Sequence, residues 1–246
     1  MTVGVRKENI TIVLNKPKYP GNIGSVARCA KNMGIENVIV VGSPPADREK
    51  ILQLATHGAA DVVDGVRRFD DLGEALSGFN YVVGTTSRLG RARRPSLHPR
   101  ELAAELVDLS QNNEVALLFG PEDFGLTNDE IRYCHALVTI PTAEAMKSIN
   151  LSHAVMIICY EIFLAGRGDR EIFTPKLATV RELEGMYGQI QALLTRVDFI
   201  SPGDADHRMM NIRRFLSRVK LYSREVRVIR GVCRQLDWYY GRNKKT

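Results

Sequence analysis

Short apolar runs alternate with segments of helical periodicity over the first two thirds of the chain. Runs of four or five mostly apolar residues that have no polar alternation are typical of strands buried on both faces of a parallel sheet. The predicted strands are 10–14, 38–41, 81–84, 115–119 and 137–140. The predicted helices between them are 25–33, 51–55, 99–109 and 151–165. We therefore expect an α/β fold, a parallel sheet with helices on both faces.

The pattern changes near Gly166, and no convincing strand follows it. Helical spacing continues over 177–199, 209–220 and 223–239, with Ser223 as the expected N-cap of the last helix. We divide the chain into a catalytic α/β domain, 1–168, and a small all-α module, 169–246.

Charge is divided unevenly between these two parts. Residues 171–246 hold 15 basic and 8 acidic side chains, against 19 and 20 in residues 1–170. Such a basic module favours a polyanionic partner, most often nucleic acid, over a merely solvated face.

Composition excludes several other classes of protein. Apolar residues make up 44% of the 246 residues, and no run approaches the roughly 20 that a spanning helix needs, so no membrane association is expected. The four cysteines form no CxxC pair, which argues against a zinc ribbon or a disulfide scaffold. We expect reduced thiols, a cytoplasmic location and no metal.

Three loops follow predicted strands, where open α/β sheets bind ligands. The first, 20–28, contains Gly21 and Gly24, which we expect to expose backbone N–H groups to an anion. It lacks GxGxxG, and Val41-Gly42-Ser43 replaces the acidic residue of a dinucleotide site, which argues against a nicotinamide-dependent oxidoreductase. The second loop is 118–128, with Thr127 and Glu130 in capping-box spacing, and the third is 140–153.

The segments GNIGSVAR, FGPEDFGL and SINLSHA in these loops resemble, in order and spacing, the three motifs of the SpoU-type SPOUT methyltransferases. The resemblance covers about residues 8–166. It implies S-adenosylmethionine as methyl donor and RNA ribose 2′-hydroxyls as acceptors, with no metal needed. It also implies a deep trefoil knot, which general folding rules disfavour, and an obligate homodimer with active sites at the interface.

The C-terminal module, with Tyr187-Gly188, Phe199 and the run 210–215, resembles that of a branch of the family. Members of this branch methylate cytidine or uridine at nucleotide 32 of the tRNA anticodon loop. Two alternatives stay open: methylation of ribosomal RNA, and a catalytically idle RNA-binding protein that keeps the fold.

The resemblance also assigns residues by position. Catalytic roles fall to Arg28, Ser148 and Asn150. The donor-binding positions are Thr85, Thr86, Ser87, Gly120, Ile140, Ser148 and Ile149. Ile149 stands where leucine is usual, and the preceding Met146-Lys147 departs from close relatives.

RNA contacts are expected at three places along the chain, the first motif, the loop after strand 81–84 and the C-terminal module. The expected contacts are Asn22, Arg28, Arg88, Arg91, Arg213, Arg214 and Arg218. The family's proposals make Arg28 a base, but a guanidinium stays protonated. We therefore expect Arg28 to hold an RNA phosphate and orient the 2′-hydroxyl. Ser148 and Asn150 are expected to hydrogen-bond the acceptor or the donor.

Overall fold

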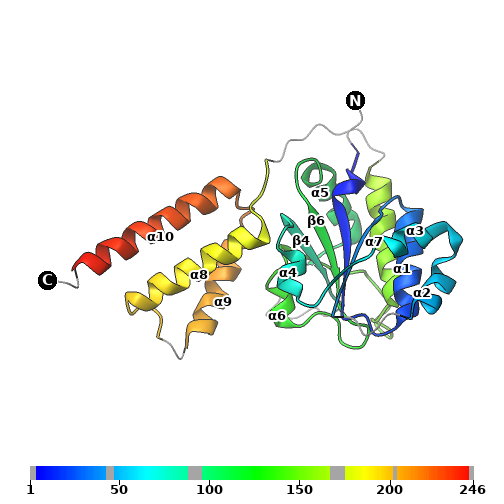
Figure 1. Cartoon of the computed structure of the whole chain (residues 1–246), viewed down its shortest axis with the longest axis horizontal. Coiled ribbons are helices and arrows are strands. Elements are labelled where there is room, and N and C mark those ends of the chain that lie inside the picture. Colours follow the sequence, from blue (N-terminus) through cyan, green and yellow to red (C-terminus); the bar gives the residue numbers. More distant parts are fainter. Residues whose placement is uncertain (1–3, 43–46, 88–95, 167–174, 202–203, 244–246) are drawn as a thin grey trace. The chain divides into compact units, whose positions relative to one another are not determined.

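The computed structural model describes residues 4–42, 47–87, 96–166, 175–201 and 204–243. The chain forms two compact units, Met1–Thr174 and Pro175–Thr246 (Figure 1). The predicted domain boundary, between residues 168 and 169, falls outside the described residues. No helix in the described ranges is long and apolar enough to span a membrane.

The first unit is built on a seven-stranded sheet in the order β3-β2-β1-β6-β4-β7-β5, in which every pairing is parallel. The strands are β1 (Ile10–Asn15), β2 (Asn37–Val41), β3 (Arg67–Phe69), β4 (Tyr81–Thr85), β5 (Ser96–Leu97), β6 (Val115–Phe119) and β7 (Ala136–Val138). All residues of β1 and β6 are buried, as the uninterrupted apolar runs predict. The predicted parallel sheet is confirmed.

Helices cover this sheet. They are α1 (Pro20–Asn32), α2 (Arg48–Ala55), α3 (Ala60–Asp64), α4 (Leu72–Leu76), α5 (Pro99–Leu109), α6 (Asn128–Ile131) and α7 (Leu151–Ala165), with 3-10 turns at Lys7–Asn9 and His57–Ala59. Figure 1 shows α1, α2 and α7 on one side of the strands and α4 and α6 on the other. Helix α7 packs against both α1 and α5. The trefoil knot stays a prediction, because strand order does not define threading.

Glycines of the first motif serve the packing of α2 on α1. A Cβ placed on Gly24 would overlap the carbonyl oxygen of Ile51, and one on Gly21 would meet the Leu54 side chain. Both glycines lie inside α1. Residues 20–24, expected to form a loop, are instead the start of α1, and α2 occupies the space that a side chain at Gly24 would take. An anion site at the backbone N–H groups of this helix start stays a prediction.

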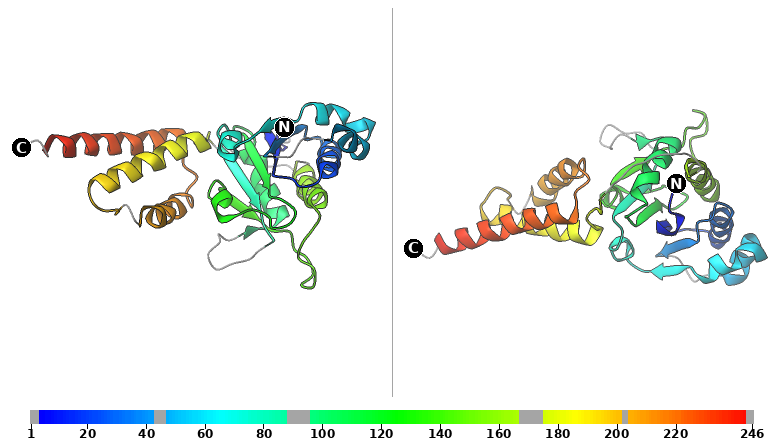
Figure 2. Two further views of the ribbon diagram at one scale, coloured as in Figure 1. Left: turned by 60° about the horizontal axis from the view of Figure 1, so that its bottom comes forward. Right: turned by 90° about the horizontal axis from the view of Figure 1, so that it is seen from above.

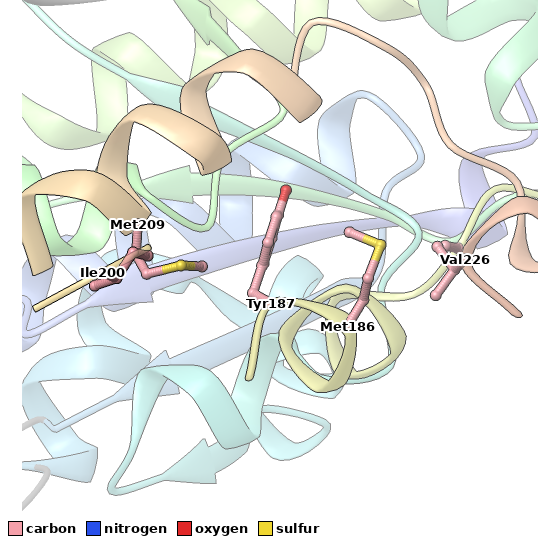
Figure 3. Close-up of a cluster of buried hydrophobic side chains, with 6 residues drawn as sticks. Met186, Tyr187, Ile200, Met209 and Val226 are labelled. Carbon is pink, nitrogen blue, oxygen red and sulfur yellow. The ribbon is translucent and has the colours of Figure 1, made fainter. Parts of the chain in front are cut away.

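The second unit contains α8 (Val180–Arg196), α9 (Ala205–Leu216) and α10 (Ser223–Asn243), and α8 and α10 pack along each other (Figure 2). Its core comprises Ala178, Met186, Tyr187, Ile200, Met209 and Val226, five of them labelled in Figure 3. Residues from all three helices and from the α8–α9 connection thus meet in one cluster, which gives this unit its own apolar core.

The N-termini of α8 and α10 correct one prediction. Thr179 and Glu182 form a capping box at α8. Ser223 is not a cap: it is the first residue of α10, and its hydroxyl donates to the Glu182 carboxylate at 3.0 Å. Partial burial alone would raise the pKa of Glu182, but hydrogen bonds from Thr179 and Ser223 outweigh it and lower the pKa.

Candidate active site

A cavity of about 200 Å³ lies where β4, β6 and β7 end. The polypeptide that leaves these three strands, together with the loop before α7, forms its wall. Every residue predicted to bind the donor lines it: Thr85, Thr86, Ser87, Gly120, Ile140, Ser148 and Ile149. Four sequence segments that span more than sixty residues are thus brought to one place at the carboxyl edge of the sheet.

The loop after β6 folds back on itself at Gly120. A Cβ there would overlap the backbone of Gly125 and Leu126, and Gly125 itself has a positive φ of 65°. Both glycines are therefore needed for the loop conformation. The loop then ends at the predicted capping box of α6, in which the Glu130 amide donates to Thr127 and the Glu130 carboxylate accepts from the Thr127 amide.

Glu122 joins this loop to the first motif. Its carboxylate accepts a hydrogen bond from the Asn22 side-chain amide at 2.6 Å and another from the backbone N–H of Lys18 at 2.9 Å. Lys18 also pairs with Asp123 at 2.6 Å. Asn22, predicted to contact RNA, is thus held from within the chain, and α1 is tied to the cavity wall.

Arg28 lies on α1 with an exposed side chain, and it does not line the cavity. It forms no ion pair with any carboxylate among the described residues. Its neighbour Cys29 donates a weak hydrogen bond to the Ser152 carbonyl of α7 at 3.5 Å, and burial raises the pKa of this thiol. Arg28 therefore lies beside the α1–α7 contact as a cation that no described carboxylate neutralises.

The two polar residues of the third motif take different positions. Ser148 lines the cavity, whereas Asn150 does not. Asn150 is the N-cap of α7: its side-chain oxygen accepts from the Ser152 N–H at 2.9 Å and from the Ser152 hydroxyl at 2.7 Å. Sequence reasoning missed this role, although an Asn directly before an apolar helical run is its usual signal.

The arginines that were predicted to bind RNA also differ in their surroundings. Arg88 and Arg91 lie outside the described residues, while Arg214 and Arg218 are exposed. Arg213 instead pairs with both Glu184 oxygens, at 2.5 and 2.7 Å, and its guanidinium lies 4.3 Å from the Tyr187 ring centroid. No three His, Cys, Asp or Glu residues within the described ranges are placed to hold a metal.

With this geometry in view, the comparisons with known proteins define the class. The model of the SpoU rRNA Methylase family matches residues 9–160. The chain belongs to this family. The model of the tRNA methyltransferase TrmJ C-terminal domain matches residues 181–245, which lie in the second unit.

Relatives narrow the family further. The chain is 35% identical over 245 residues to a tRNA (cytidine/uridine-2′-O-)-methyltransferase TrmJ from Cronobacter sakazakii, covering 97% of this chain and 99% of that protein. The crystal structure of TrmJ from Z. mobilis ZM4 superposes with a TM-score of 0.79 at 27% identity, covering 92% of this chain and 98% of that one. Within its family the chain therefore groups with the TrmJ methyltransferases.

A more distant structural match was solved with AdoMet bound. An AdoMet-bound rRNA methyltransferase from Sinorhizobium meliloti matches with a TM-score of 0.51 at 25% identity, over 66% of this chain and 57% of that one.

Proposed function

We propose that the chain transfers a methyl group from S-adenosylmethionine to the ribose 2′-hydroxyl of cytidine or uridine at nucleotide 32 of tRNA, in the cytoplasm. The observation that carries this proposal is the convergence of all seven predicted donor-binding residues on one cavity. The grouping with TrmJ methyltransferases supports tRNA as substrate. Four free cysteines agree with a reducing compartment.

The cavity wall suits the donor chemically. The hydroxyl groups of Ser87 and Ser148 offer hydrogen bonds to a ribose, and the Thr85 hydroxyl, which donates to the Leu118 carbonyl at 3.2 Å, can accept one. Leu126, Val138, Ile140 and Ile149 offer an apolar surface to a purine. Bound there, S-adenosylmethionine supplies a methyl group already activated on a sulfonium, so the protein must mainly align the acceptor and help remove its proton.

The chain's own residues supply alignment. The guanidinium of Arg28 has N–H donors and no acceptor atom, so it binds an RNA phosphate and positions the attacking 2′-hydroxyl rather than acting as a base. Ser148 presents its hydroxyl inside the cavity. Asn150 is a positioning residue: by capping α7 it fixes the segment that carries Ser148 and Ile149. Glu122 and Asn22 hold α1, and thus Arg28, to the loop that lines the cavity.

A homodimer completes the site in this proposal. Arg28 does not line the cavity of its own chain. Beside α1, helix α7 exposes the apolar row Ile157, Tyr160 and Leu164, at spacings of three and four residues. Pairing of two copies through this surface buries the row and brings Arg28 of one protomer to the donor cavity of its partner.

Subunit mixing tests this composite site. Arg28→Ala removes the cation, and Gly120→Ala forces the donor loop away from its position. Each variant alone is expected to be inactive toward tRNA. After subunit exchange, a 1:1 mixture recovers about a quarter of wild-type activity, because half of the dimers are mixed and each has one intact site.

Two controls make the result decisive. Arg28→Ala must still bind S-adenosylmethionine by calorimetry, and subunit exchange is verified by native mass spectrometry with one isotopically labelled variant. Mixed dimers that form and stay inactive contradict a site shared between protomers.

A further inference from the structure

The solvent face of α10 carries a straight row of residues, Arg224, Arg227, Gly231, Arg234 and Trp238, which we name the α10 row. Spacings of three, four, three and four residues place them along one side of the helix. The three arginines and Trp238 are exposed. Arg227 and Arg234, seven residues apart, are separated by about 10 Å along the helix axis.

Within the part of the chain that the structure describes, the arginines of this row are not neutralised by ion pairs. Other arginines of the same unit have carboxylate partners: Arg196 pairs with Asp237 at 2.7 Å and Arg208 with Asp204 at 2.9 Å. Arg213 pairs with Glu184. By contrast, no carboxylate of the described residues pairs with Arg224, Arg227 or Arg234.

Gly231 interrupts the row at a cost to the helix. Glycine inside a helix is less favourable than alanine by roughly 1 kcal/mol. Packing gives no reason for it here, because, apart from the adjacent helix backbone, the only described atom within 4 Å of a Cβ added at Gly231 is a guanidinium nitrogen of Arg234, at 4.0 Å. A missing side chain between two cations lets a polymer backbone approach the helix closely.

Trp238 adds a planar apolar surface at the end of the row. Its side chain is 55% exposed, and the Arg242 guanidinium lies 5.4 Å from its ring centroid. Exposed aromatic rings among arginines are the usual platform for unpaired nucleic-acid bases, whereas phosphates are bound by the cations.

We propose that the α10 row is an RNA-binding surface of the enzyme, in which Arg227 and Arg234 bind phosphates and Trp238 stacks on an unpaired base of the tRNA. This inference rests on the proposed function and adds a binding surface to it. Beside the row, Val228, Val232 and Leu236 form an exposed apolar stripe. Pairing of two α10 helices through that stripe would bring two unneutralised arginine rows together, so charge favours RNA over a second copy.

Trp238 is the only tryptophan of the chain, so intrinsic fluorescence observes the surface directly. Titration of the full-length protein with unfractionated tRNA is expected to quench this fluorescence. Trp238→Ala is expected to weaken tRNA binding about 5- to 150-fold, the equivalent of roughly 1–3 kcal/mol for one stacked base, while Trp238→Phe retains most of the affinity.

The salt dependence of tRNA binding tests whether Arg227 and Arg234 bind phosphates. For Arg227→Ala/Arg234→Ala, the slope of log K against log salt is expected to decrease by about 1.4–1.8 in magnitude, the contribution of two phosphate contacts. The matched control is Arg196→Ala/Arg208→Ala, which removes two arginines of the same unit that already have carboxylate partners. Its slope stays near that of the wild type.

Three results would overturn the proposal. The first is an unchanged fluorescence on tRNA binding. The second is an equal loss of slope in both double variants. The third is intact tRNA affinity in the row variants combined with altered self-association in sedimentation, which would make the face a protein interface. If the wild type methylates tRNA in these cases, only this inference fails; if the wild type neither binds nor methylates tRNA, the proposed function fails with it.

Discussion

Replacement of Arg213 tests whether this arginine stabilises the fold or binds RNA. The sequence places Arg213 among the RNA contacts, but the structure engages it with Glu184 through two hydrogen bonds and with the ring of Tyr187. The side chain of Arg213 is 22% exposed and that of Glu184 is 34% exposed, so the pair is only partly screened by water. We expect Arg213→Ala to destabilise the C-terminal unit without changing the salt dependence of tRNA binding.

The expected loss of unfolding free energy for Arg213→Ala lies between two known limits. Exposed ion pairs contribute about 0.2–1 kcal/mol, and hydrogen bonds between charged groups in less exposed places contribute about 1.5–3 kcal/mol. A half-buried bidentate pair with a cation–π contact should therefore contribute about 1–2 kcal/mol. Because Arg213 packs on Tyr187, which belongs to the core, this loss should reach the whole unit.

Urea unfolding followed by Trp238 fluorescence measures this effect, since the single tryptophan lies in the same unit. A double-mutant cycle with Glu184→Ala should give a coupling energy of about 1 kcal/mol. Arg214→Ala, an exposed neighbour, is the matched control and should leave the unfolding midpoint unchanged. An unchanged unfolding midpoint for Arg213→Ala, together with a reduced salt dependence of tRNA binding, would refute the reasoning and would show that Arg213 contacts RNA.

Three further predictions follow from other parts of the chain. Gly24→Ala should lower the melting temperature, because the added Cβ overlaps the Ile51 carbonyl and overpacking costs roughly 1–3 kcal/mol. Gly78→Ala should not lower it, because no described atom lies within 4 Å of a Cβ added there. Equal effects of the two variants in calorimetry would contradict this account of the α1–α2 contact. Gly120→Ala should weaken S-adenosylmethionine binding at least tenfold, equivalent to about 1.4 kcal/mol, because the loop that lines the cavity must move. Unchanged affinity in titration calorimetry would show that this loop does not contribute to donor binding. The folded state lowers the pKa of Glu182 below its ordinary value of 4.5, so its contribution is fully present above that pH and is lost as the pH falls through the folded-state value. Glu182→Gln should therefore flatten the acid-induced loss of stability of the C-terminal unit, and urea midpoints that fall with pH as steeply as those of the wild type would oppose this role.

Apolar runs were sufficient to predict the five interior strands, because strands buried on both faces leave an unbroken signal. The short edge strands were missed. β3 consists of Arg67-Arg68-Phe69, with both arginines exposed, and β5 has only two residues, so neither carries an apolar run. β7 ends at Val138 rather than at residue 140, and both Val138 and Ile140 line the cavity.

Site residues were predictable where a motif fixes the loop, and less so where the partner lies far along the chain. The donor-binding positions were predicted from the family resemblance, at the segment after strand 81–84 and in the second and third loops, and they line one cavity. By contrast, the contacts of Glu122 with Asn22 and of Arg213 with Glu184 join residues 100 and 29 positions apart. Sequence spacing alone could not separate such engaged side chains from free ones, which is why Arg213 was grouped with Arg214 and Arg218.

Transfer of label from methyl-labelled S-adenosylmethionine to purified RNA tests the central claim most directly. Unmodified tRNA and ribosomal RNA are offered separately, and the products are digested for nucleoside mass spectrometry, with Arg28→Ala as the matched inactive control. The account predicts 2′-O-methylcytidine or 2′-O-methyluridine in tRNA, mapping to nucleotide 32. Label in ribosomal RNA alone, or none in either RNA by a protein that still binds the donor, would contradict it.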